Sequence, residues 1–141
     1  MISVDIARFP RHLRAAALPG GRVKPGEDAR TILVREMQEE LAELVEVDEL
    51  LYLVENFFTH ADKPNHEVGI YFRARLQRQS AILDMSGKHW GIENNRKLEF
   101  QWFACEQLDS IDLHPSFLRQ ALAKRVLQFE HVVQRPTGSA T

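Results

Sequence analysis

Four glutamates fall within eight residues of this chain, directly behind a turn made of Pro19, Gly20 and Gly21. The four are Glu36, Glu39, Glu40 and Glu43. Such close negative charges repel one another unless water screens them or a cation binds among them. Carboxylate oxygens are the ligands that Mg²⁺ and Mn²⁺ prefer. The cluster is therefore either a solvated acidic surface or a site for divalent cations.

The residues behind the turn have the periodicity of an amphipathic helix. At about 100° per residue, Leu33, Met37 and Leu41 gather on one side, while the glutamates gather on another. Like charges three and four residues apart destabilise a helix by a few tenths of a kcal/mol per pair, and Arg35 is the only basic residue close to them in sequence. We expect a helix over residues 29–44 that begins after Asp28 as its N-cap.

The glycine turn favours the cation site over an idle surface. Glycine allows the backbone to approach a ligand closely. A glycine loop that leads into a helix of metal-binding carboxylates suits a pyrophosphate, because bound metals bridge phosphate oxygens. Gly20, Gly21 and Lys24 of this loop are therefore candidate substrate contacts.

The spacing resembles the signature of the Nudix hydrolases. That signature is a glycine, five residues, a glutamate, seven residues, and then R-E-U-x-E-E-x-G-U, where U is a bulky apolar residue. The matching residues here are Gly21, Glu27, Arg35, Glu36, Met37, Glu39 and Glu40. The resemblance extends over roughly residues 15–133, with "WF" in a late strand.

This resemblance implies an α/β/α sandwich with a mixed β-sheet. It also implies Mg²⁺- or Mn²⁺-dependent cleavage of a nucleoside diphosphate linked to another moiety. Glu36, Glu39 and Glu40 would hold the metal, with the Gly20 carbonyl as a further candidate ligand. Arg35 would pair with Glu27, since a guanidinium fork can clamp a carboxylate. The alternative is a catalytically inactive Nudix module that binds a nucleotide or metabolite as a regulator.

The chain departs from the signature at two places. Ala42 replaces the glycine and Glu43 replaces the last apolar residue. Alanine in left-handed geometry costs on the order of 1 kcal/mol, so we expect the helix to continue through Glu43 to Leu44 or Val45. Leu44 would then fill the core position, and Glu43 would be solvated. The short stretch before the glycine turn also predicts a shortened N-terminal strand, an exposed sheet edge and a possible homodimer.

The attacking water needs a proton acceptor, and three glutamates outside the signature are candidates. They are Glu93 in an expected loop, Glu67 in a hairpin and Glu99 on a late strand. We favour Glu93, because a mobile loop can close over substrate. Each of the three is otherwise an ordinary surface carboxylate.

Two more substrate contacts are candidates on the strand at 67–77. Its alternation places Val68, Ile70 and Phe72 on one face and Tyr71 and Arg73 on a wetter face. Tyrosine could stack on a base and arginine could bind phosphate. The alternative is an ordinary exposed strand face.

The rest of the pattern predicts an α/β protein. We expect strands at 2–9, 15–18, 49–59, 67–77 and 98–105, a hairpin turn at 61–66, a polar loop at 78–97 and an amphipathic helix at 114–133. The length of 141 residues suits a single domain over 1–135 with a flexible tail at 136–141.

Composition excludes several other classes. The net charge of −2 gives no general attraction to nucleic acid or to an anionic membrane, and no apolar run approaches the roughly 20 residues of a membrane span. Cys105 is the only cysteine, and we interpret it as a structural thiol. We expect a cytoplasmic protein whose partner is a small, nucleotide-type substrate.

Overall fold

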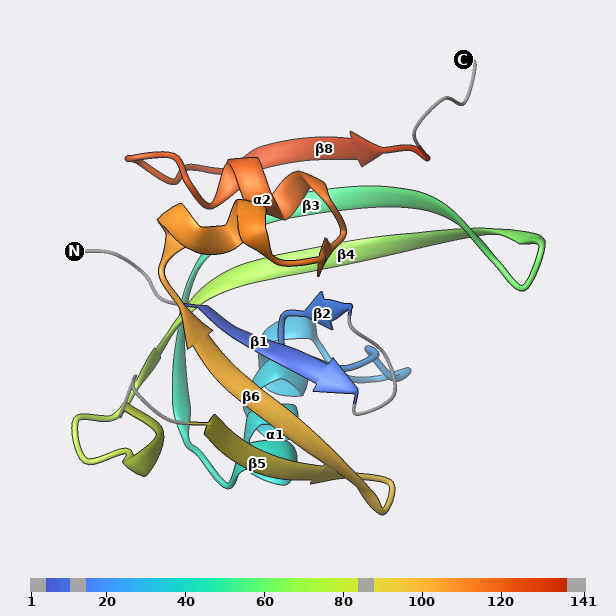
Figure 1. Cartoon of the computed structure of the whole chain (residues 1–141). Helices are drawn as coiled ribbons and strands as arrows, with labels where there is room; N and C mark the ends of the chain where they lie inside the picture. The colour runs from blue at the N-terminus through green and yellow to red at the C-terminus, as the bar shows by residue number, and fades with distance from the viewer. Residues whose placement is uncertain (1–4, 11–14, 84–87, 137–141) are drawn as a thin grey trace.

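The strands that the structure describes divide between two mixed β-sheets (Figure 1). The structure, a computed structural model, describes residues 5–10, 15–83 and 88–136. The first sheet has the order β5-β6-β1-β2-β7, and its strands are β1 (Asp5–Pro10), β2 (Ala16–Ala17), β5 (Lys88–Glu93), β6 (Arg96–Phe103) and β7 (Leu113–His114). The second has the order β4-β3-β8, from β3 (Val45–His60), β4 (Lys63–Leu76) and β8 (Glu130–Gln134). The expected mixed α/β fold is confirmed.

Both sheets combine antiparallel and parallel pairs. β7 runs parallel to β2, and β8 runs parallel to β3. β1 lies between β6 and β2, so the described edge strands of this sheet are β5 and β7 rather than the N-terminal strand. The proposed tail at 136–141 lies outside the described residues except for Pro136. Within the described parts, no helix is long and apolar enough to cross a membrane.

The main helix, α1 (Ala29–Leu41), begins as expected at Asp28. The backbone N–H and the hydroxyl of Thr31 both donate to the Asp28 carboxylate at 2.9 Å. These hydrogen bonds, the backbone one first, hold the pKa of Asp28 below its usual value. The buried residues Met37 and Leu41 pack with Val45, Leu98 and Phe100, which fixes α1 against the first sheet.

The end of α1 differs from the expectation. The helix stops at Leu41, and Ala42 adopts left-handed geometry with φ 55° and ψ 33°. Its N–H donates to the Gln38 carbonyl at 3.0 Å. Glu43 therefore lies beyond the helix, Leu44 is 51% exposed, and Val45 rather than Leu44 fills the core position at 5% exposure. Burial of Val45 favours this sharp reversal over continuation of the helix, despite the cost of a left-handed alanine.

The expected loop at 78–97 is also wrong over most of its described length. It contains a 3-10 turn, η1 (Ala81–Leu83), and strand β5. β5 pairs with β6 across Asn94 and Asn95, which have φ values of 46° and 64°. A pair of left-handed residues is the geometry of the tightest hairpin turns. The indole of Trp102 donates to the Ile82 carbonyl at 2.6 Å and holds η1 against the sheet.

The expected C-terminal helix over 114–133 is replaced by shorter elements. These are α2 (Phe117–Ala121) and strand β8, and the 3-10 helix η2 (Cys105–Ser110) precedes them. Val132 packs against the larger core cluster, and the Gln134 side chain accepts from the Phe117 backbone at 3.0 Å. Tertiary pairing with β3 thus overrides the helical pattern of this segment. Cys105 is buried, as expected.

The antiparallel hairpin of β3 and β4 is confirmed, but its turn is confined to Ala61 and Asp62 rather than 61–66, because β4 begins at Lys63. Its far end projects from the body of the molecule in Figure 1. The prediction that Tyr71 lies on the more solvent-exposed face of β4 is wrong. Its ring packs edge-on against Phe117, with 6.0 Å between ring centroids. Val68, on the opposite face, is 59% exposed. The cause is α2, which covers the Tyr71 face of the sheet.

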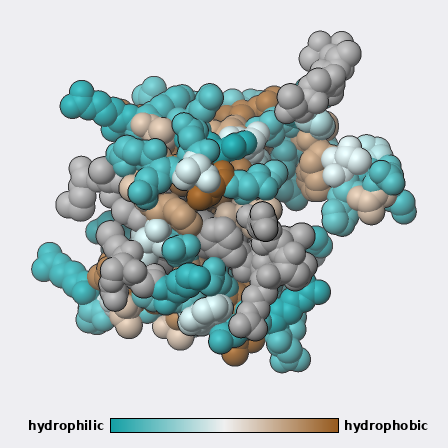
Figure 2. All heavy atoms as spheres, viewed as in Figure 1, coloured by the Kyte–Doolittle hydropathy of each residue, from teal (hydrophilic) through white to brown (hydrophobic). Residues whose placement is uncertain are grey.

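Hydrophilic residues predominate on the face of the molecule shown in Figure 2, and the hydrophobic residues there form small, separate patches. This distribution is usual for a folded domain with its apolar side chains in the core. Two clusters make up that core. One surrounds Tyr52, Val54 and Leu118, and the other joins α1 to β6.

The left-handed alanine predicts a stabilising substitution. Ala42→Gly should raise the free energy of unfolding by about 0.5–1 kcal/mol, because glycine adopts positive φ without the steric cost. Chemical denaturation measures this change. As a control, Gln38→Gly in the exposed interior of the same helix should destabilise by about 1 kcal/mol. Destabilisation by Ala42→Gly would mean that the helix continues past Leu41.

Candidate active site

An ion pair joins the loop before α1 to the helix itself. Arg35 Nη2 lies 3.3 Å from Glu27 Oε2, and both side chains are partly buried. The structure thus brings together the two residues that the sequence predicted to pair. This contact ties the glycine-containing segment to the first turns of α1.

The same guanidinium also contacts two glutamates of the helix. Arg35 Nη1 lies 3.3 Å from Glu36 Oε1 and 3.1 Å from Glu39 Oε2. The hydrogen bond to Glu39, followed by the attraction of Glu27 and Glu39, raises the pKa of Arg35 above its usual value, against the opposing effect of burial. One arginine therefore neutralises part of the charge of three carboxylates, which the sequence pattern alone did not reveal.

Gly21 provides the space that Glu36 occupies. A Cβ atom at Gly21 would overlap the carboxylate of Glu36, whose side chain is only 15% exposed. The neighbouring Gly20 has open space around its position. The glycine of the signature is therefore explained by a steric contact with the first glutamate of the helix.

Glu40 lies on the buried side of α1, where it is 4% exposed. Strand β5 approaches the helix so closely there that a Cβ atom at Gly91 would overlap the backbone oxygen of Glu40. It would also lie 2.9 Å from the ring of Phe100. Our sequence reasoning missed Gly91. The signal was a lone glycine in an alternating stretch, "KHWGIE", which often marks a close backbone approach.

Glu93 is placed on a strand rather than in a mobile loop. It ends β5 and is opposite Arg96 across the hairpin turn. Strand alternation gives it the same face as Gly91, which is the face that contacts α1. Glu99 instead pairs with Lys88 at 3.1 Å. The position of Glu93 is thus consistent with a role near the helix, although the reason we gave from the sequence was wrong.

The third candidate base, Glu67, and the strand candidates for substrate contact have structural contacts elsewhere. Glu67 accepts from Asn56 at 3.5 Å on the exposed hairpin. Arg73 pairs with Glu49 of β3 at 2.6 Å. Burial, with a smaller effect of Glu67, raises the pKa of Tyr71 to about 12. Tyr71 is therefore partly buried against the core, whereas Lys24 is exposed in the loop before α1.

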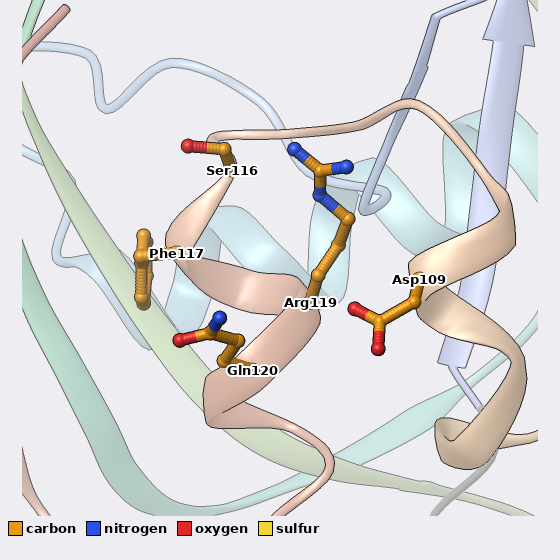
Figure 3. Close-up of a pocket in the computed structure, with 5 residues that line it drawn as sticks. All are labelled: Asp109, Ser116, Phe117, Arg119 and Gln120. Atoms are coloured by element: carbon orange, nitrogen blue, oxygen red, sulfur yellow. The ribbon is translucent and has the colours of Figure 1, made fainter. Parts of the chain in front are cut away.

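Two hollows on the described surface are candidate binding sites. The one in Figure 3, of about 350 Å³, is lined by Asp109 of η2 and by Ser116, Phe117, Arg119 and Gln120 at α2. The other, of about 690 Å³, follows the outer side of α1 and includes Arg35 and Glu39 in its lining. Only the second touches the candidate site.

A family model described as the NUDIX domain matches residues 6–124. The match covers more than half of the chain and includes the glycine turn, α1 and most of both sheets. The chain therefore belongs to the Nudix family. Members are pyrophosphohydrolases, so this protein is a hydrolase that acts on phosphoanhydride bonds.

Nudix hydrolases in general require divalent cations, and the donor types present here fit that requirement. Glu36, Glu39 and Glu40 offer carboxylate oxygens, which suit Mg²⁺ and Mn²⁺. Gly21 leaves room for Glu36 beside the glycine turn. In the described parts of the chain, however, no three acidic, histidine or cysteine side chains converge at metal-binding spacing. The glutamates would have to reorient to hold a metal together.

The contact between β5 and α1 predicts the effect of a single methyl group. Gly91→Ala should lower the free energy of unfolding by about 1–3 kcal/mol, because the clash is with rigid backbone. Urea denaturation measures this loss. Gly20→Ala, where the space is open, is the matched control and should leave stability nearly unchanged. Equal stability of the two variants would show that β5 does not lie against Glu40.

Proposed function

We propose that this Nudix hydrolase cleaves a nucleoside diphosphate linked to another moiety, and that it does so with Mg²⁺ or Mn²⁺. The observation that carries the proposal is the arrangement of the signature: Glu36 lies against the Gly21 turn, and Arg35 fastens Glu27 to the same helix. These contacts hold the phosphate-binding loop and the carboxylates as one unit.

Each residue of the unit has a separate role in this proposal. Glu36, Glu39 and Glu40 hold the divalent cations, with the Gly20 carbonyl as a further ligand. Divalent cations held by these residues would supply positive charge for the phosphates and a more acidic water. Gly21 and Lys24 contact the pyrophosphate, and the Arg35–Glu27 pair keeps the loop in place.

Glu93 is our candidate for the general base. It would accept a proton from the attacking water while the new oxygen–phosphorus bond forms and the bridging phosphoanhydride bond breaks. The leaving phosphate takes the bonding electron pair. The location of Glu93 on the α1-facing side of β5 supports this assignment. Tyr71 and Arg73 stay candidate substrate contacts, although Tyr71 packs against Phe117 and Arg73 pairs with Glu49.

A purely regulatory Nudix module is not favoured. Such a module would need neither three metal-type carboxylates nor the arginine that braces them, and all of these residues are present. We further propose a cytoplasmic location, which the single buried thiol suits. A homodimer stays a hypothesis that the mass in solution would test.

The proposed chemistry predicts loss of turnover on removal of one carboxylate. With nucleotide sugars, ADP-ribose, dinucleotides and nucleoside triphosphates as the panel, hydrolysis should require Mg²⁺ or Mn²⁺. Glu40→Gln should lower kcat/KM by at least about 100-fold. Loss of a residue that only supports a metal ligand costs up to about 100-fold, and Glu40 is proposed as a ligand itself. Phosphate release with a coupled phosphatase is the measurement.

The matched control is Glu46→Gln, which makes the same change in charge at an exposed residue paired with Arg75. It should keep the activity of the unaltered protein. Hydrolysis that persists in EDTA, or that survives Glu40→Gln, would contradict the proposal.

A further inference from the structure

The two terminal nitrogens of Arg35 contact different kinds of carboxylate. Nη2 lies 3.3 Å from Glu27, which belongs to the loop before the helix. Nη1 lies 3.3 Å from Glu36 and within 3.2 Å of both oxygens of Glu39. Glu36 and Glu39 are two of the three glutamates that would hold a divalent cation. The brace and the metal-binding carboxylates thus share one guanidinium.

A divalent cation and Nη1 would compete for the same oxygens. A bound Mg²⁺ lies about 2.1 Å from each carboxylate oxygen, so it would be only a few ångströms from the positive guanidinium if Nη1 kept its contacts. The two cations would repel each other strongly at that separation. In the described structure both carboxylates contact Nη1, at 3.3 Å for Glu36 and 3.1 Å for Glu39.

We propose that Arg35 acts as an internal counter-cation that lowers the affinity of this site for divalent metal. Metal binding displaces Nη1 from Glu36 and Glu39, while Nη2 stays on Glu27 as the pivot. Without metal, the guanidinium offsets the repulsion within the acidic helix. This inference rests on the proposed metal dependence, and it assigns Arg35 a role in setting metal affinity beyond its role as a brace.

A simple brace and a competing cation give opposite expectations. If Arg35 only braced the loop, its removal would loosen Glu36 and weaken metal binding. If Nη1 competes with metal, removal of the guanidinium should strengthen metal binding and lower the stability of the metal-free protein. Glu27→Gln separates the two effects, because it removes the brace and leaves Nη1 free to contact Glu36 and Glu39.

The test is a titration of the metal-stripped full chain with Mn²⁺. Electron paramagnetic resonance measures the concentration of free Mn²⁺ at each step. Arg35→Gln should bind Mn²⁺ about 2- to 5-fold more tightly than the unaltered protein, a change of the order that partly exposed ion pairs produce. Without metal, the thermal unfolding midpoint of Arg35→Gln should be lower than that of the unaltered protein. Addition of Mn²⁺ should raise the midpoint of the variant by more than it raises that of the unaltered protein. Glu27→Gln should bind no more tightly than the unaltered protein.

Unchanged or weaker Mn²⁺ binding by Arg35→Gln would overturn the proposal, as would equal tightening by Glu27→Gln. If Arg35→Gln does not fold, the side-chain ¹⁵N signals of Arg35 in the unaltered protein provide a second test. Addition of Mg²⁺ should release the hindered rotation of the guanidinium, and signals that do not change would overturn the proposal.

The outcomes also separate this inference from the proposed function. Tighter Mn²⁺ binding by Arg35→Gln in a protein that hydrolyses none of the panel would support the counter-cation and contradict the proposed reaction. Absence of Mn²⁺ binding in every variant would overturn both.

Discussion

Charge repulsion on one short helix is the constraint around which this site is built. Glu36, Glu39 and Glu40 lie within two turns, and α1 bears them because Arg35 contacts two of them and joins them to Glu27. The same contacts fix the loop relative to the helix. Electrostatic relief and positioning of the glycine turn therefore depend on a single side chain, through different nitrogens of its guanidinium.

Steric fit holds this helix against the sheet. Met37 and Leu41 bury their side chains with Val45 and Phe100, and two glycines allow the closest approaches. Gly21 admits the carboxylate of Glu36, whereas Gly91 admits the backbone of Glu40. The site therefore has a glycine on each side, Gly21 in the loop and Gly91 in strand β5, where a larger residue would clash.

The sequence was most informative where chemistry requires fixed spacing. The Arg35–Glu27 pair follows from the resemblance to the Nudix signature and the N-cap at Asp28 from local rules, and the structure has both contacts. The errors arose where contacts with residues distant in the sequence determine the secondary structure. The sequence pattern at 114–133 predicts a helix, but the end of this segment forms β8 and pairs with β3. The turn at Asn94-Asn95 was a readable local signal for β5 that the polar composition around it obscured.

The parallel pairing of β8 with β3 has a consequence for where this protein can be cut. The region shared with the Nudix family ends at residue 124, but β8 spans Glu130–Gln134 and Val132 packs into the core. Gln134 also accepts from the backbone of Phe117 and so reaches back to α2. The cooperative folding unit is thus longer than the homologous region. A fragment trimmed to the family boundary would leave one side of β3 unpaired and prone to aggregation.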